Sequence, residues 1–561
     1  METTGSTTSN QQTNGHVVNG DAGPVDLDAV IIGGGFGGMY GLYKFRKLGL
    51  RVKLLEAAPY FGGTWYWNRY PGARVDSETP LYSLSIPEVY QGWTWSERFP
   101  GHEEIRRYFK HVDDVLSLSK DSLFDTVVVG ASWDGTKWTV RTKSARVFRC
   151  RFLLAATGSS YKKYYPDFKG LQDYRGVLIH SAEYPVGGIE TDNKRIAVVG
   201  NGATGIQIVS ELGKTNCQLT AFVRTPSMTF PMAQRKLTVE EQENQKNFYD
   251  HLFASAKTAP VGFPYNHSPW PSVWDVSDEV REARFEYLWK QGGFVFQLSN
   301  FPDFLYDEKA NALFYDFWRR KVRERVKTPY KADIVAPRKQ HIFFGTKRAS
   351  LEQDYYEVLD RPNVKLVNLK ETPIKEFNET GIETSGAAGH QQLDFDVIIL
   401  ATGFDAVTGS LLDMGISDKD GKPLSETWRD GVRTHLGLAL PNVPNLFMVY
   451  SPQAPTALSN GPPIIEYQVD WAVRAIQKMQ TAEQGAIHAV YATPEAAEKW
   501  TDDIQAANEK TLFPRTDSWW MGANIPGKKR QQLMYINGLH EYIKACDAAL
   551  DSWQGFQCVK E

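Results

Sequence analysis

The sequence has 561 residues, which is enough for two to four domains that each bury a core of their own. Hydrophobic residues make up 42% of the chain and charged residues 23%, as in ordinary globular proteins. Because 63 Lys and Arg residues nearly balance 66 Asp and Glu residues, the composition argues against a general nucleic-acid-binding protein.

The cysteines and the N-terminus indicate where the protein works. Cys150, Cys217, Cys546 and Cys558 are scattered, without a CxxC pair or a zinc-type spacing. This pattern argues against a disulfide framework or a metal site and favours a reducing compartment, which we predict to be the cytoplasm. Residues 1–26 are polar, so we predict a disordered tail rather than a signal peptide. No run approaches the roughly 18 apolar residues of a membrane span.

A first strand–helix–strand unit is predicted directly after the tail. It comprises an apolar strand at 27–32, a helix at 39–48 and a second strand at 51–55. The turn holds the spacing GxGxxG, with Gly33, Gly35 and Gly38. In this context the first glycine permits the tight turn, the second lets the backbone approach a pyrophosphate, and the third lets helix and strand pack closely. Glu56 ends the second strand and can accept both ribose hydroxyls, which favours a ribose without a 2′-phosphate, such as that of FAD.

The same pattern returns near the middle of the chain. Its elements are a strand at 195–199, a helix at 206–213 and a strand at 218–223. Its turn glycines are Gly200, Gly202 and Gly205. The second strand is followed by Arg224, a cation that cannot accept hydroxyls but pairs well with a 2′-phosphate. We therefore predict NADP(H) here, and an α/β fold class with two dinucleotide-binding Rossmann-like domains.

The remaining segments predict how these domains are divided. Residues 239–333 interleave charges with aromatic residues at helical spacing, which predicts a helical insertion. Two further strands end in Thr-Gly, at 153–158 and 397–403, and each can return the chain to a dinucleotide sheet. We expect an FAD-binding domain at 27–180 and 393–561, the latter with C-terminal helices and a cofactor loop, and an NADP-binding domain at 181–238 and 334–392.

FAD and NADPH on one chain imply hydride transfer to the flavin. A disulfide reductase would then need a redox CxxC beside the flavin, and the sequence has none. A monooxygenase passes the electrons to oxygen instead.

Several motifs point to one family. The first stretch contains Gly62-Gly63-Thr64-Trp65, Tyr70-Pro71-Gly72 and Asp76. The second contains Phe168-Lys169-Gly170, Gly176, His180, Tyr184 and Pro185. Both resemble the signatures of type I Baeyer–Villiger monooxygenases, although the second usually has Trp where this chain has Tyr184. The segments 344–348, 401–405 and 519–527 resemble the family's active-site arginine segment, its second Thr-Gly strand and its mobile cofactor loop.

The resemblance implies an enzyme that oxidises ketones and some sulfides with FAD, NADPH and O2. In that chemistry an anionic flavin peroxide attacks the ketone carbonyl, so a permanent cation is needed beside the flavin. The resemblance assigns this role to Arg348, with Asp76 orienting it and Lys347 helping Arg224 to hold the 2′-phosphate. It adds four cofactor-binding candidates, Thr64, Trp65, Thr204 and Thr225, and it implies that Asp76 and Arg348 also contact the cofactors. It also implies that Trp519 reaches the cofactor or substrate, and that His180 bonds between domains rather than moving protons.

Two alternative functions stay open from the sequence. A flavin monooxygenase that oxidises nitrogen or sulfur would need no arginine at a carbonyl site. A flavin-binding redox sensor would bind FAD with negligible turnover. Residues 451–460 form a plausible pocket loop, but the ketone and the oligomeric state are not encoded in a recognisable way.

Overall fold

The fold is built around two parallel sheets. The computed structural model describes residues 23–265, 268–387, 389–481 and 486–560. Each sheet has five strands. Strands β2 and β18 are four-residue apolar runs buried along their whole length, as expected where helices or loops cover both faces of a parallel sheet.

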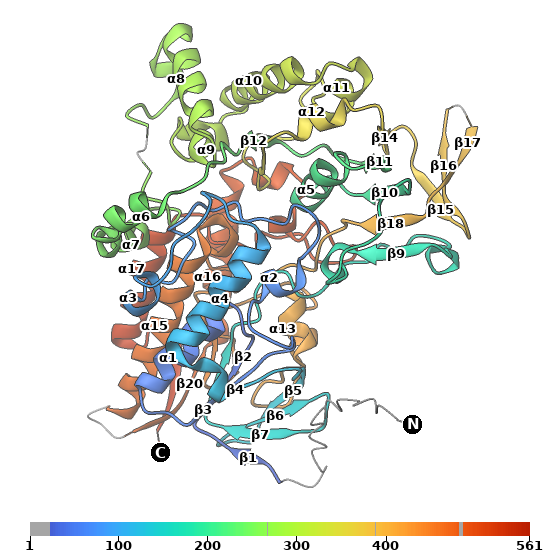
Figure 1. Ribbon diagram of the computed structural model, residues 1–561. Helices are drawn as coiled ribbons and strands as arrows, with labels where there is room; N and C mark the ends of the chain where they lie inside the picture. Colours follow the sequence, from blue (N-terminus) through green and yellow to red (C-terminus); the bar gives the residue numbers. More distant parts are fainter. Residues whose placement is uncertain (1–22, 266–267, 388, 482–485, 561) are drawn as a thin grey trace, which may run out of the picture.

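The first sheet lies in the lower half of the molecule (Figure 1). In spatial order its strands are β19 (Leu446–Met448), β8 (Phe152–Ala155), β2 (Ala29–Ile32), β3 (Val52–Leu55) and β4 (Ser122–Leu123). Helix α1 (Phe36–Lys47) packs against the long helix α15 (Gly461–Gln480). The other helices of this half are α2 (Thr64–Trp67), α3 (Pro87–Tyr90), α4 (His102–Leu116), α13 (Gly409–Asp413), α14 (Leu424–Thr427), α16 (Pro494–Glu509) and α17 (Leu539–Ser552).

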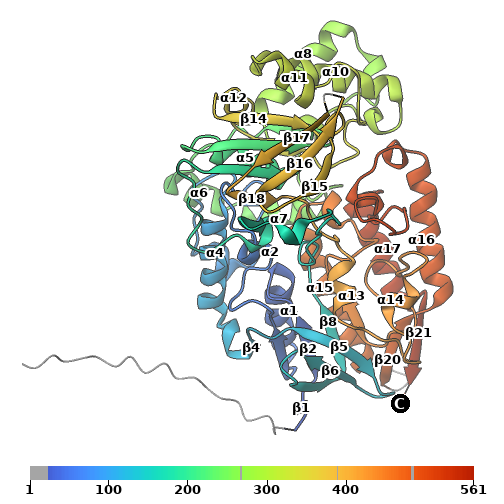
Figure 2. The same ribbon diagram turned by 90° about the vertical axis from the view of Figure 1, so that its right-hand side faces the viewer.

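Two small sheets extend this half of the molecule. One has the order β1 (Val25–Asp26), β7 (Val147–Cys150), β6 (Trp138–Thr142) and β5 (Val128–Trp133). The other pairs β20 (Ile487–Ala492) with β21 (Phe556–Lys560) beside the C-terminal helices (Figure 2). The expected tail over 1–26 is wrong at its end, because Val25 and Asp26 pair with Phe148 and Arg149 in β7. Residues 1–22 of that prediction lie outside the described residues.

The second sheet lies above the first. Its order is β14 (Val364–Asn368), β11 (Gln218–Val223), β10 (Arg195–Val199), β18 (Val397–Leu400) and β9 (Val177–His180). Helices α5 (Ala203–Leu212) and α12 (Tyr355–Leu359) pack together beside it. An antiparallel meander of β15 (Ile374–Phe377), β16 (Gly381–Gly386) and β17 (Gly389–Asp394) projects from this half (Figure 1).

Most of the segment predicted as a helical insertion forms the top of the molecule, but its first two helices lie lower, beside the C-terminal helix α17 (Figure 1). Its helices are α6 (Val239–Lys246), α7 (Tyr249–Thr258), α8 (Asp278–Gln291), α9 (Val295–Leu298), α10 (Glu308–Arg325) and α11 (Pro329–Val335). Their buried faces are largely aromatic. The Phe285 and Phe314 rings lie 4.6 Å apart, and Phe296 packs on Phe317 and Phe344. The aromatic residues that alternate with charges in the sequence therefore build a core, which also contacts strand β12 (Thr229–Pro231) through α8.

Two strands depart from the expected domain boundaries. The sequence pattern places Val177–His180 in the first part of the FAD-binding domain. It places Val397–Leu400 at the start of the second part of that domain. In the structure β18 pairs with β10 on one side and β9 on the other, so both belong to the second sheet. The other Thr-Gly strand, β8, does join the first sheet beside β2. Short apolar strands of this kind look alike in the sequence, and only long-range pairing decides which sheet each one joins.

Among the described residues, no helix is both long enough and apolar enough to cross a lipid bilayer.

Candidate active site

A large cavity lies at the carboxyl ends of the strands in both sheets. Its volume is about 1410 Å³. The residues that follow β2, β3, β8, β10, β11, β18 and β19 all contribute to its wall. Ligands of open α/β sheets bind at this edge. Because clefts for one small ligand usually measure about 300–1,000 Å³, the cavity has room for more than one molecule.

The first glycine turn forms one end of the cavity. Gly33 has a φ of +105°, a backbone conformation that glycine adopts without strain. A Cβ on Gly38 would lie 1.7 Å from the carbonyl oxygen of Gly33, so only glycine allows helix α1 to start this close to β2. A Cβ on Gly35 would meet nothing closer than 3.5 Å, which leaves the backbone there open to a ligand.

Glu56 lies at the end of β3, as predicted, and lines the cavity. Its carboxylate accepts hydrogen bonds from the backbone N–H groups of Gly34 and Ala58. Burial raises the pKa of Glu56 above its ordinary value, and the two backbone donors oppose this shift. The carboxylate is thus held in place beside the glycine turn, with acceptor capacity left for a hydroxyl.

The second glycine turn forms the other end of the cavity. Gly200 has a φ of +123°, and a Cβ on Gly205 would lie 2.1 Å from the carbonyl oxygen of Gly200. A Cβ on Gly202 would meet no protein atom within 4 Å. The first and third glycines are therefore needed for the fold, whereas the second one faces open space.

We expect Gly202→Ala to leave the thermal unfolding midpoint unchanged but to weaken NADPH binding about 10-fold, or about 1.4 kcal/mol, because the methyl group keeps a pyrophosphate from the backbone. A titration of the purified protein with NADPH measures this. Gly205→Ala is the contrasting variant, since its methyl group meets Gly200 and should lower the unfolding midpoint. Unchanged NADPH affinity in Gly202→Ala would contradict the role of this turn.

Two cations lie together beside the second turn. Arg224 follows β11, and Arg224, Thr225 and Lys347 all line the cavity. Burial and the charge of Arg224 lower the pKa of Lys347, while Asp517 opposes the shift. Within the described ranges neither cation has a carboxylate within 4.0 Å. Two like charges held this close favour an anionic ligand between them.

Arg348 and Asp76 form an ion pair in the wall of the cavity. Arg348 donates from Nε to Oδ2 of Asp76 at 2.7 Å and from Nη2 to Oδ1 at 2.9 Å. Its Nη1 donates to the carbonyl oxygen of Ala457 at 2.7 Å, and its guanidinium lies 5.0 Å from the centroid of the Phe294 ring. Burial opposes the charge on Arg348, but Asp76 outweighs it and raises the pKa of the guanidinium above its ordinary value. The arginine is therefore a permanent cation in a fixed orientation.

The segment that carries Asp76 is held against the second sheet. Tyr70 donates a hydrogen bond to Gln207 of α5 at 3.0 Å, and Thr204 donates to Tyr70 at 3.3 Å. Gly72 has a φ of +79°, and a Cβ on it would lie 2.8 Å from the carbonyl oxygen of Gln207. The motif at 70–72 thus brings the two halves of the molecule together and sets the position of Asp76.

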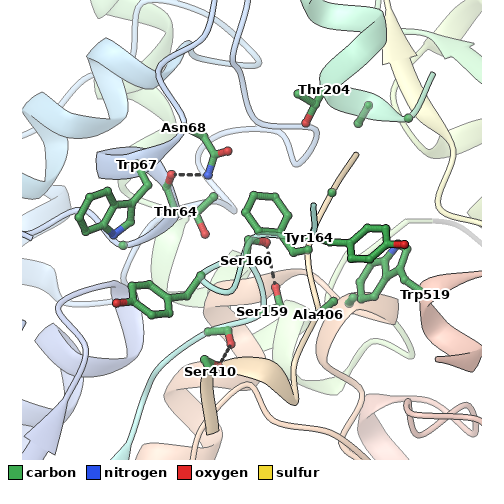
Figure 3. Close-up of a pocket in the computed structure, with 18 of the residues that line it drawn as sticks. Thr64, Trp67, Asn68, Ser159, Ser160, Tyr164, Thr204, Ala406, Ser410 and Trp519 are labelled. Carbon is green, nitrogen blue, oxygen red and sulfur yellow. Dashed lines mark hydrogen bonds between the residues drawn. The ribbon is translucent and has the colours of Figure 1, made fainter. Parts of the chain in front are cut away.

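The residues of the motif at 62–65 lie on the side of the first sheet. Thr64 begins α2 and is exposed toward the cavity, and Asn68 donates to its carbonyl oxygen at 2.9 Å (Figure 3). Trp65 is 9% exposed and donates from its indole nitrogen to the hydroxyl of Tyr82 at 2.9 Å. Figure 3 also shows Thr204 from the other half of the molecule, so the cavity spans both dinucleotide units.

Trp519 lies at the rim of the same cavity (Figure 3). Its neighbour Trp520 is 2% exposed and packs against Phe513, so the two adjacent tryptophans have different environments. The segment that contains these tryptophans is attached at three points, one before them and two after. Thr346 donates to Thr516 at 2.7 Å; Asn524 donates to the carbonyl oxygen of Phe404 at 2.9 Å; and Lys528 pairs with Asp405 at 2.8 Å.

His180 bonds between strand β9 and the linker that follows β18. Its Nδ1 accepts from the N–H of Ala182 at 3.2 Å, so Nε2 carries the proton that it donates to the carbonyl oxygen of Gly403 at 3.1 Å. Burial lowers the pKa of His180 below its ordinary value. A neutral histidine with both nitrogens engaged links segments and is not placed to move protons.

The structure adds residues that the sequence patterns missed. The carbonyl of Ala457 and the ring of Phe294 contact Arg348, and the rings of Tyr82 and Tyr450 lie in the cavity wall. Of the predicted pocket loop at 451–460, only Ala457 and Ser459 line the cavity. Tyr450 closely follows an apolar strand, which is a weak sequence signal; the other residues carry none, because backbone carbonyls and aromatic residues are common everywhere.

Comparisons with known proteins agree with this arrangement. The pyridine nucleotide-disulphide oxidoreductase family matches residues 27–248, which hold both glycine turns. Cyclopentanone 1,2-monooxygenase from Comamonas sp. is 40% identical over 533 residues, covering 94% of this chain and 96% of the relative. A Baeyer–Villiger monooxygenase from Pseudooceanicola batsensis is 35% identical, covering 93% and 94%.

A solved structure, OTEMO in complex with FAD and NADP, superposes with a TM-score of 0.90 at 34% identity, and the match covers 95% of this chain and 99% of that one. The identity to the two relatives extends over nearly the whole length of each chain. The protein therefore belongs to the family of Baeyer–Villiger monooxygenases.

Proposed function

We propose that this protein inserts one oxygen atom of O2 next to the carbonyl of a small-molecule ketone, giving an ester or lactone, with FAD and NADPH as cofactors. The observation that carries the proposal is the Arg348–Asp76 pair, a permanent cation facing a cavity that also receives both dinucleotide turns. Oxidation of nitrogen or sulfur would not require this cation.

FAD fits the first glycine turn. The open backbone at Gly35 would receive the pyrophosphate, and Glu56 would accept the ribose hydroxyls. Thr64 and Trp65 would contact the same cofactor from α2, close to Asp76. When bound, the flavin supplies the redox chemistry, because it accepts a hydride from NADPH and reacts with O2.

NADPH fits the second glycine turn. The open backbone at Gly202, with Thr204 beside it, would receive the pyrophosphate at the N-terminus of α5. Arg224, Thr225 and Lys347 would hold the 2′-phosphate, which explains why two cations lie together with no carboxylate of the described chain paired to them.

Arg348 would stabilise negative charge as it develops on the carbonyl oxygen of the substrate. Such preorganised charge is among the largest single contributions that an enzyme makes to a rate. Asp76 holds one edge of the guanidinium through Nε and Nη2, and the carbonyl of Ala457 accepts from Nη1, so the cation needs no reorganisation during the reaction. Phe294 covers one face of the guanidinium and excludes water from it.

We propose that the first sheet with the C-terminal helices binds FAD, and that the second sheet, including β9 and β18, binds NADP. The scattered cysteines, all without a disulfide among the described residues, support a cytoplasmic location.

Product analysis tests the function. The purified protein is supplied with NADPH, O2 and a panel of aryl, linear and polycyclic ketones, and products are identified by mass spectrometry. We expect esters or lactones that carry one atom of ¹⁸O from ¹⁸O2. A thioether and an amine in the same panel test the alternative: products from these alone, with no ester from any ketone, would contradict the proposal. Bound FAD without substrate-dependent NADPH consumption would indicate a redox sensor.

We expect hydrogen exchange across residues 517–528 to slow when NADP binds, because Trp519 at the cavity rim would contact the cofactor and close over it. Lys528→Ala should speed exchange in the NADP-bound state about 3- to 10-fold, since it removes the ion pair with Asp405. Lys499→Ala is the matched control, because its ion pair with Asp503 is exposed and lies on α16. Equal protection with and without NADP would mean that the loop is not a lid.

A further inference from the structure

The loop after strand β19 has an unusual backbone. Tyr450, Gln453 and Thr456 have φ angles of +56°, +64° and +41°. Residues other than glycine rarely adopt this left-handed conformation, because their Cβ crowds the neighbouring carbonyl. Such positions persist where the surrounding structure holds them, and they gather at functional sites. Of these three residues, only Tyr450 lines the cavity.

Buried hydrogen bonds hold the backbone of Tyr450 in place. Its N–H donates to Oε1 of Gln468 at 2.7 Å. The amide nitrogen of Gln468 donates to the hydroxyl of Tyr542 at 3.0 Å, and that hydroxyl donates to the carbonyl oxygen of Leu436 at 2.7 Å. Gln468 and Tyr542 are both fully buried. Residues of helices α15 and α17 therefore hold the backbone of Tyr450 in an unfavourable φ.

The side chain of Tyr450 lines the same cavity as the Arg348–Asp76 pair. A Cβ on Gly461 would lie 3.9 Å from a ring carbon of Tyr82 and 4.0 Å from one of Tyr450, so the two rings share this corner of the cavity. Burial raises the pKa of Tyr450, Arg348 lowers it and Asp76 raises it. The hydroxyl is thus within electrostatic range of the ion pair and is protonated at neutral pH, which makes it a hydrogen-bond donor.

In the described part of the chain the hydroxyl of Tyr450 has no hydrogen-bond partner, and that of Tyr82 accepts from Trp65 but has no acceptor for its own proton. Arg348 uses three of the five N–H groups of its guanidinium on Asp76 and Ala457. The lining of the cavity, as far as the chain is described, therefore includes two kinds of hydrogen-bond donor without an acceptor: guanidinium N–H groups and a phenol O–H. A carbonyl oxygen has two lone pairs and matches such an arrangement.

We propose that Tyr450 binds the carbonyl oxygen of the substrate by donating a hydrogen bond from its hydroxyl, beside Arg348. The inference rests on the proposed function, because it requires a ketone substrate. It makes Tyr450 a specificity-determining residue, since a site that hydrogen-bonds an oxygen discriminates against analogues that lack it.

Binding to the oxidised protein, loaded with FAD and NADP+ and without turnover, tests the inference. The two probes are cyclohexanone and methylenecyclohexane, which have the same shape but differ in the carbonyl oxygen. Tyr450→Phe keeps the ring and removes the donor. We expect it to weaken cyclohexanone binding about 3- to 10-fold and to leave methylenecyclohexane binding unchanged, as measured by calorimetry.

Two further variants separate this contact from general effects. Tyr174→Phe removes a buried phenol that donates to the carbonyl oxygen of Phe395 outside the cavity, and it should change neither affinity. Tyr450→Gly should have a higher unfolding midpoint than Tyr450→Ala, because glycine adopts the left-handed backbone without strain.

Three outcomes would overturn the inference. Equal losses of affinity for both probes in Tyr450→Phe would show that the side chain only packs against the ligand. In that case ester formation by the wild-type protein would still support the proposed function. A wild-type protein that binds cyclohexanone no better than methylenecyclohexane would show that no donor meets the carbonyl. A midpoint for Tyr450→Ala as high as that of Tyr450→Gly would remove the argument from the backbone.

Discussion

Arg348→Ala is expected to lower the rate of ester formation about 10²- to 10³-fold while NADPH still reduces the flavin. The positive charge is needed only at the step in which the carbonyl oxygen becomes negative, so hydride transfer should be spared. Stopped-flow absorbance of the flavin and mass spectrometry of the products measure the two steps separately. NADPH consumption should then continue without a matching yield of ester.

Arg348→Lys is the informative companion to this variant. It keeps a positive charge but loses the planar fork that meets both oxygens of Asp76 and the carbonyl of Ala457. We expect ester yield between those of the wild type and Arg348→Ala. A yield in Arg348→Ala equal to that of the wild type would disprove the assignment of Arg348. Circular dichroism should be recorded for both variants, because removal of the arginine leaves Asp76 without its partner.

Arg224→Ala is expected to weaken NADPH binding about 10- to 150-fold, which corresponds to about 1.5–3 kcal/mol for a lost charge-assisted contact. NADH binding should change little, because NADH has no 2′-phosphate. Initial rates of flavin reduction at varied NADPH and NADH concentrations measure both constants. The ratio of the two affinities therefore reports on the phosphate contact alone.

Lys347→Ala extends this test. Because Arg224 lowers the pKa of Lys347, the two cations interact. Their contributions to the free energy of NADPH binding should therefore not add in the double variant. We expect the double variant to bind NADPH and NADH with similar affinity. Equal losses for both nucleotides in Arg224→Ala would show that this residue does not read the 2′-phosphate.

Much of the fold could be predicted because its signals are local. Strands β2 and β10, the glycine turns after them, and the helices α1 and α5 are each specified within about a dozen consecutive residues. The steric reason is visible in the structure: Gly38 and Gly205 each lie where a Cβ would collide with the first glycine of the same turn. Such constraints do not depend on the rest of the chain, so the turns can be predicted from consecutive residues alone.

The assignment of strands to sheets could not be read in the same way. Strands β8 and β18 are both buried apolar runs of four residues that lead into Thr-Gly, yet β8 pairs with β2 and β18 with β10. Nothing in either strand distinguishes the two sheets. The choice depends on the neighbours available after the chain has collapsed, which is a property of long-range pairing.

The sequence by itself determined that this protein has two dinucleotide-binding units and the motifs of a Baeyer–Villiger monooxygenase. Only the tertiary structure decided what surrounds the reactive site. Arg348 and Asp76 are 272 residues apart and meet because the motif at 70–72 packs on α5. Phe294 joins them from the segment after α8, and Ala457 and Tyr450 from the loop after β19. The physical reason is that a turn is specified by local steric limits, whereas the environment of a charge depends on contacts between distant parts of the chain.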